Sequence, residues 1–113
     1  RIFGALRDAG VNLLAAHAFP SARKSQIDLV PADTVAFLSA AKSAGLKLSK
    51  PKTMFLIEGD DRAGALTSML SRLGTAGINV TALTAVRSGA GRFGALLWVN
   101  AKDVRKAAET LGV

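Results

Sequence analysis

One short motif occurs twice in this chain, and it constrains the fold more than any other feature. Residues 6–13 (LRDAGVNL) align with residues 73–80 (LGTAGINV), so that Gly10 and Gly77 occupy matching places 67 residues apart. An alternating apolar segment follows each copy, and an alanine-rich segment typical of a helix comes later. Such internal similarity indicates a repeated supersecondary unit. We therefore expect two modules, residues 1–50 and residues 51–113.

The second copy begins with a strand and a helix. Residues 53–58 form a short apolar segment between Pro51 and a Gly-Asp-Asp turn, a pattern typical of a buried strand. From Ala63 onward apolar residues recur at spacings of three and four, as on the buried face of a helix. These residues are Leu66, Met69, Leu70 and Leu73.

A hairpin and a second helix complete this copy. Residues 78–86 and 93–99 are predicted strands, and the glycines of residues 88–91 predict the hairpin turn between them. Asp103 caps or opens a last helix that runs through Leu111. The two residues after it are at most the start of a closing strand.

The first copy repeats this order from its first helix onward. The expected elements are a helix at residues 1–10, strands at 11–19 and 25–30 around a turn at 20–24, a helix at 33–44 and a closing strand at 46–48. Nothing in it aligns with residues 53–67, so this copy lacks its opening strand and the loop that follows. The predicted fold class is α+β: tandem βαββαβ ferredoxin-like modules, with antiparallel four-stranded sheets and both helices on one face.

The composition excludes several kinds of chemistry. The chain has no cysteine and a single histidine, His17, so we expect no disulfide, no thiolate zinc site, no metal and no cofactor. His17 lies in an alternating strand without a base or nucleophile near it in sequence, which favours a structural role. Trp98 and the five phenylalanines are expected in the core. No apolar run approaches the length of a membrane span, so we expect a cytoplasmic protein without membrane contact.

The candidate site is the loop between the first strand and the first helix of the second copy. A helix N-terminus has unpaired amides and accepts a carboxylate or phosphate readily, and Asp61 is a natural N-cap there. Gly64 allows the backbone to come close to a ligand. We expect Asn79, at the start of the next strand, to lie beside this loop and to donate and accept hydrogen bonds.

These residues resemble the ACT domain family. Its usual pattern is Asp-Arg-Pro-Gly-x-Leu followed by Leu-x-x-x-Gly-Ile-Asn-Ile, and residues 61–66 and 73–80 match it, with Ala63 in place of the commonest proline. The resemblance covers the second copy and, from its helix onward, the first. It implies amino-acid or small-effector binding between the loop of one module and an adjoining module. The residues carried over are Asp61, Arg62, Ala63, Gly64, Ala65 and Leu66, then Ile78, Asn79 and Val80, and in the first copy Val11, Asn12 and Leu13.

The same resemblance implies a regulatory role rather than catalysis. ACT modules usually regulate an attached enzyme, and this chain contains no catalytic domain, so the expectation is a free-standing sensor or a small subunit that regulates an enzyme in trans. The motif specifies the expected small-molecule ligand only by its class, an amino acid or similar effector. Open sheet edges favour pairing of modules, so we also expect a homodimer.

Two other interpretations stay open, and a third motif is assigned to a hairpin. The net charge of +7 suggests a nucleic-acid-binding module, although the strand at residues 78–86 has no aromatic platform and the lysines of residues 42–52 suit a solvated connector. Arg62 with Asn79 could hold a phosphoryl group, as in an acylphosphatase. Residues 89–94 match G-x-G-x-x-G, but a strand rather than a helix follows, which favours a hairpin over a dinucleotide site.

Overall fold

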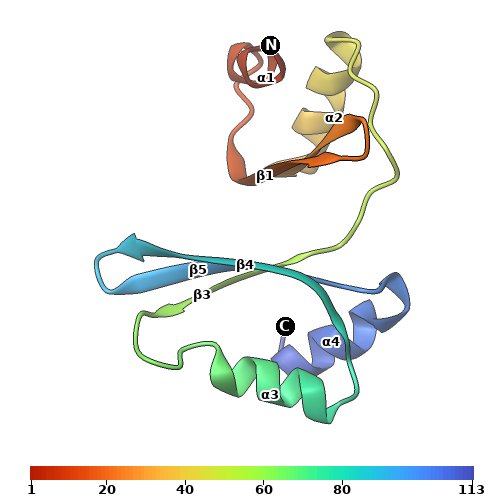
Figure 1. The fold of residues 1–113 in the computed structure, drawn as a ribbon. Coiled ribbons are helices and arrows are strands. Elements are labelled where there is room, and N and C mark those ends of the chain that lie inside the picture. Colours follow the sequence, from red (N-terminus) through yellow and green to blue (C-terminus); the bar gives the residue numbers. More distant parts are fainter. The chain divides into compact units, whose positions relative to one another are not determined.

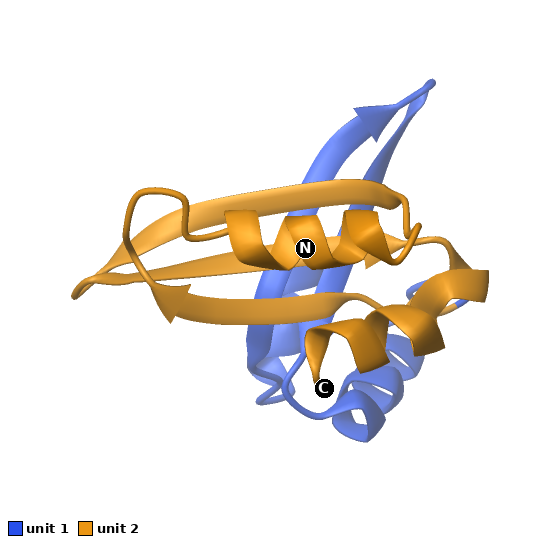
Figure 2. Ribbon diagram, turned by 90° about the horizontal axis from the view of Figure 1, so that it is seen from below, with its two compact units in different colours: residues 1–50 blue, residues 51–113 orange.

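The computed structural model describes all 113 residues, and they form two compact units. Unit 1 comprises Arg1–Lys50 and unit 2 comprises Pro51–Val113 (Figure 2). Each unit has its own antiparallel sheet and two α-helices, which lie on the same face of that sheet (Figure 1). The predicted class, tandem α+β modules of the ferredoxin-like type, is therefore confirmed.

Unit 2 contains a three-stranded sheet. Its elements are β3 (Phe55–Asp60), α3 (Thr67–Thr75), β4 (Val80–Gly89), β5 (Arg92–Val99), a 3-10 turn η1 (Ala101–Asp103) and α4 (Val104–Leu111). The strand order is β3-β5-β4, and both neighbours run antiparallel to β5. Strands β3 and β4 consequently run in the same direction, so their carboxyl ends meet at one end of the sheet. That end carries the loop between β3 and α3.

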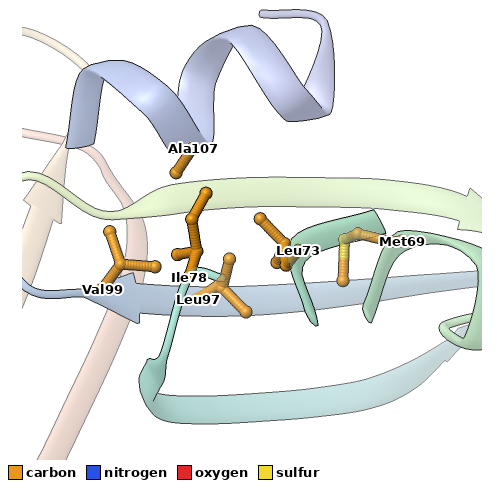
Figure 3. Close-up of a cluster of buried hydrophobic side chains, with 6 residues drawn as sticks. All are labelled: Met69, Leu73, Ile78, Leu97, Val99 and Ala107. Carbon is orange, nitrogen blue, oxygen red and sulfur yellow. The ribbon is translucent and has the colours of Figure 1, made fainter. Parts of the chain in front are cut away.

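The core of unit 2 lies between this sheet and its two helices. Figure 3 shows side chains from α3, α4 and β5 directed toward one another. The buried members are Met69, Leu73, Ile78, Leu97, Val99 and Ala107. The spacing of Met69 and Leu73 places both on the inner face of α3, as the sequence periodicity predicts.

Unit 1 contains a two-stranded sheet and a smaller core. Its elements are α1 (Ile2–Asp8), β1 (Leu13–Ser21), β2 (Lys24–Pro31) and α2 (Thr34–Ser43). The fully or nearly buried apolar residues are Leu6, Phe37 and Ala41. Asp33 caps α2 because its carboxylate accepts a hydrogen bond from the amide of Ala36, at 3.1 Å.

The hairpin between β4 and β5 turns through only two residues. Ala90 and Gly91 both have positive φ, 54° and 71°, which is the backbone of a type I′ turn. The strands therefore continue closer to the turn than the four-residue turn predicted at 88–91. The G-x-G-x-x-G match is confirmed as a hairpin.

The closing strand expected at residues 46–48 is absent, as is any strand after α4, so neither sheet has four strands. Residues 46–54 form neither helix nor strand, and Gly112 ends α4 in a left-handed conformation with φ 78°. In this topology a closing strand pairs with the opening strand, and unit 1 has no opening strand with which residues 46–48 could pair. Local apolar character alone does not hold a strand without a partner.

Two smaller expectations also differ from the structure. Asp103 opens α4 as expected, but its side chain makes no capping hydrogen bond, because Asp103 is also the last residue of η1 and has a helical conformation. Phe3 and Phe19 are exposed rather than in the core, since the sheet of unit 1 has only two strands to cover them. Phe37 and Trp98 are buried as predicted.

Candidate functional site

The loop between β3 and α3 is fixed by backbone hydrogen bonds. The amide of Asp61 donates to the carbonyl of Gly91 at 2.8 Å, which ties the loop to the β4–β5 turn. Within the loop, the amide of Ala65 donates to Arg62 and the amide of Thr67 to Gly64. Gly64 has φ 72°, a conformation that glycine adopts without strain.

Helix α3 begins later than the sequence indicates, at Thr67. Its N-cap residue is Leu66, and no side chain caps this end. The prediction that Asp61 is the N-cap is therefore wrong, because residues 63–66 form turns before the helix starts. The carboxylate of Asp61 is left free for another partner, and the first amides of α3 have no side-chain acceptor.

A pocket of about 370 Å³ lies beside this loop, and we call it the loop pocket. Its walls come from the loop, from the first turns of α3, from the end of β4 and from the start of β5. The lining residues are Asp61, Arg62, Gly64, Ala65, Leu66, Thr67, Leu70, Ala85, Val86, Arg87 and Phe93. A volume of this size is at the lower end of the range for small-molecule sites.

Charges of both signs line the loop pocket. The guanidinium Nε of Arg87 lies 3.1 Å from Oδ2 of Asp61, and Arg62 lines the same pocket without an ion-pair partner. A second pair, Asp60 with Arg92 at 2.8 Å, lies next to it at the ends of β3 and β5. The lining of the loop pocket thus combines one carboxylate and two guanidinium groups with the apolar side chains of Leu66 and Leu70.

The Asp61–Arg87 pair is expected to add little to stability. The side chain of Arg87 is 74% exposed and that of Asp61 is 37% exposed, so water screens their attraction. Arg87→Ala should lower the free energy of unfolding by less than about 1 kcal/mol, as should Arg92→Ala, the matched change in the neighbouring pair. Urea unfolding followed by tryptophan fluorescence measures both. A loss well above this value for Arg87→Ala alone would show that the pair is a structural anchor of the loop.

A second hollow, of about 630 Å³, runs along the free edge of β3, and we call it the edge groove. It lies between β3, the inner face of α3 and the end of α4. The lining residues are Met54, Phe55, Leu56, Ile57, Glu58, Gly59, Asp60, Arg62, Ala65, Leu66, Met69, Arg72, Phe93, Leu111 and Val113. Although it is larger, it holds fewer of the predicted residues than the loop pocket, so we place the candidate site in the loop pocket.

Phe93 forms part of the wall of both hollows. It stands opposite Gly59 in the pairing of β3 with β5. A Cβ atom added at Gly59 would come within 2.7 Å of Cε1 of Phe93. Because Gly59 has no side chain, the ring of Phe93 can lie against this strand between the two hollows.

The structure brings together five of the six predicted loop residues. Asp61, Arg62, Gly64, Ala65 and Leu66 line the loop pocket, whereas Ala63 does not. The sequence did not single out the other lining residues, above all Thr67, Arg87 and Phe93. The sequence shows that residue 87 is basic. Arg87 lies close to Asp61 only because β3 and β4 run in the same direction on either side of β5.

Asn79 does not lie beside the loop of its own unit, so that expectation is wrong. Asp60 pairs with Arg92 at one end of β5, and Val80 pairs with Val99 at the other. Seven residues of extended strand separate these ends by roughly 23 Å. Ile78 and Asn79 belong to that far end too, and Ile78 is buried in the core.

The same geometry removes the acylphosphatase interpretation. Arg62 lines the loop pocket and Asn79 lies at the opposite end of the sheet, so the two side chains cannot hold one phosphoryl group within unit 2. The other predicted residues, Val11, Asn12 and Leu13, lie in unit 1 between α1 and β1 and at the start of β1. His17 lies further along β1, with its ring 5.0 Å from that of Phe19.

The described residues show neither a metal cluster nor a membrane helix. No group of three or more histidine, cysteine or acidic side chains could hold a metal ion. No helix has the length and apolar character required to cross a membrane. Part of the positive charge lies in the segment between the units and in ion pairs. Lys47, Lys50 and Lys52 lie outside helices and strands, and Arg87 and Arg92 face carboxylates.

Comparison with one solved structure supports the fold. Protein BT0572 from Bacteroides thetaiotaomicron is similar with a TM-score of 0.82 and 17% identity, over 98% of this chain and 74% of that one. A candidate glycine cleavage system transcriptional repressor gives a TM-score of 0.43 and 10% identity, over 98% of this chain and 78% of that one. No protein-family model and no curated protein sequence matches the chain. The likeness to BT0572 shows a shared fold.

Proposed function

We propose that unit 2 is a non-catalytic sensor that binds an amino acid or a similarly small zwitterion in the loop pocket. The observation that carries this proposal is the pairing of opposite charges on one pocket wall, Asp61 with Arg87 at 3.1 Å. A zwitterion offers an ammonium group to Asp61 and a carboxylate to Arg87, so it can replace this exposed pair by two charge-assisted contacts.

Two further features of the pocket favour a bound carboxylate. Arg62 lines it without an ion-pair partner, and the N-terminus of α3 has no side-chain cap. The unpaired amides of a helix N-terminus and its partial positive charge favour an anion at this position. The hydroxyl of Thr67, at the same helix end, adds a donor and acceptor, while Leu66 and Leu70 supply apolar contact for a side chain.

The groups present suit binding better than catalysis. The pocket lining contains no histidine and no lysine, and its one carboxylate faces a guanidinium group. A general base needs an orienting partner and a pKa suited to proton transfer, and a nucleophile needs such a base. We propose that this binding regulates a partner enzyme in trans.

We propose that the remaining residues of the motif contribute to the site from another module. Ile78, Asn79 and Val80 lie too far from the loop pocket of their own unit to take part in it. We propose that the end of a sheet in a second copy of the chain, with Asn79 or Asn12 as its polar group, completes the site in a homodimer. Val11, Leu13 and Ala63 would then act through their backbone.

A thermal-shift screen against the twenty amino acids tests the proposal. A ligand at about 100 times its dissociation constant should stabilise the protein by about 2.7 kcal/mol, because it binds only the folded state. Asp61→Asn keeps the shape of the side chain but removes its charge, so it should abolish most of this stabilisation. Glu109→Gln, an exposed change on α4 outside both hollows, serves as the matched control and should leave the response intact.

Two outcomes would contradict the proposal. The first is the absence of stabilisation by any amino acid. The second is an equal response in the Asp61→Asn and Glu109→Gln proteins, which would place the ligand elsewhere.

A further inference from the structure

The charges that line the loop pocket do not balance. The lining contains one carboxylate, that of Asp61, and two guanidinium groups, those of Arg62 and Arg87. Its other residues are uncharged. Since Asp61 faces Arg87 at 3.1 Å, the excess positive charge of the pocket belongs to Arg62.

The acidic groups near the pocket do not neutralise Arg62. Asp60 is already paired with Arg92, at 2.8 Å. Glu58, the other carboxylate of β3, lines the edge groove but not the loop pocket. Neither of them forms an ion pair with Arg62. The guanidinium group of Arg62 is therefore available to an anionic group from outside the chain.

A neutral amino acid leaves this guanidinium group without a partner. Bound as proposed above, it presents its ammonium group to Asp61 and its α-carboxylate to Arg87, and these contacts use all of its charges. A second carboxylate on the ligand would give Arg62 a partner as well. Contacts between a guanidinium group and a carboxylate are among the stronger hydrogen bonds in proteins, and their fork geometry adds specificity.

We propose that the ligand of the loop pocket is an acidic amino acid and that Arg62 selects it by binding the carboxylate of its side chain. This inference rests on the proposed function, because it takes over the placement of the ammonium group and the α-carboxylate. At neutral pH such a ligand has one net negative charge, which matches the excess charge of the pocket. Leu66 and Leu70, which also line the pocket, supply apolar contact for the methylene groups of the ligand.

Isothermal titration calorimetry with two pairs of amino acids tests this inference. Glutamate and glutamine have nearly the same shape and differ in the charge of the side chain, as do aspartate and asparagine. The acid that fits the pocket should bind about 5-fold more tightly than its amide. This ratio corresponds to about 1 kcal/mol, the upper end of what an exposed ion pair contributes.

Two substitutions at Arg62 identify the group that selects the acid. Arg62→Gln removes the charge, so the ratio of the two affinities should fall to about one. Arg62→Lys keeps the charge and should retain a preference for the acid. Both variants keep the backbone carbonyl of residue 62, which accepts the hydrogen bond from the amide of Ala65. Equal melting temperatures without ligand would verify that the loop and the unit remain folded.

Arg105→Gln is the matched control. Arg105 is exposed on α4 and lines neither hollow, but its substitution lowers the net charge of the chain as much as Arg62→Gln does. The ratio of affinities should therefore stay at the value of the unmodified protein. An equal fall in both glutamine variants would mean that the overall charge of the chain, and not Arg62, favours the acid.

Two further outcomes would overturn the inference. Equal affinity for acid and amide in the unmodified protein would show that the pocket does not select an acidic side chain, and the proposed function would still stand. An undiminished preference in Arg62→Gln would assign the selection to another group. If none of the twenty amino acids binds, the proposed function itself fails, and the inference fails with it.

Discussion

Leu73→Ala is expected to lower the free energy of unfolding of unit 2 by about 2 to 5 kcal/mol. Leu73 is 0% exposed and lies in the core between α3, α4 and the sheet (Figure 3). Truncation removes buried apolar atoms and leaves a cavity that close-packed neighbours fill only in part. Since small domains are stable by only about 5 to 15 kcal/mol, this single change removes a large share of the total.

Urea unfolding followed by tryptophan fluorescence measures this effect. Trp98 is the only tryptophan of the chain and is buried in β5, so its emission reports on unit 2. Val86→Ala on β4 is the control, because Val86 is 64% exposed and its truncation should change stability by no more than about 0.5 kcal/mol. Equal effects of the two substitutions would mean that the packing around Leu73 is not as described.

Gly59→Ala is expected to destabilise unit 2 by about 1 to 3 kcal/mol, the usual cost of overpacking. The new methyl group would stand 2.7 Å from the ring of Phe93, so the ring or the strand must move. Alanine is otherwise better than glycine in a strand by about 0.5 to 1 kcal/mol, and the steric cost exceeds this gain. Because Phe93 lines the loop pocket, a displaced ring should also weaken any amino-acid response.

Gly94→Ala is the matched control for this prediction. Gly94 lies in the adjacent strand β5, and a Cβ atom there would meet no atom within 4 Å, so the substitution should be neutral or stabilising. Combining Gly59→Ala with Phe93→Leu should cost less than the sum of the two single changes by at least about 0.5 kcal/mol, because the shorter side chain relieves the contact. Strict additivity in urea unfolding would contradict a direct conflict between Gly59 and Phe93.

Local features of the sequence predicted most of the elements correctly. The four-residue spacing of Met69 and Leu73, the alternation in the strands and the glycines of the hairpin each depend on neighbours in the chain, so they can be read without knowing the fold. Predictions that required a distant partner were less reliable. The closing strand at residues 46–48 has suitable apolar residues but no strand with which to pair.

The sequence alone determined the repeat, the α+β class, the order of elements and the loop Asp61–Leu66 as a candidate site. Only the tertiary structure decided what surrounds that loop. In the folded unit Arg87 lies beside Asp61, Phe93 stands opposite Gly59, and Asn79 lies at the far end of the sheet. The physical reason is that pairing register and strand direction, which fix these neighbours, arise from hydrogen bonds and packing between segments far apart in sequence, and no local spacing encodes them.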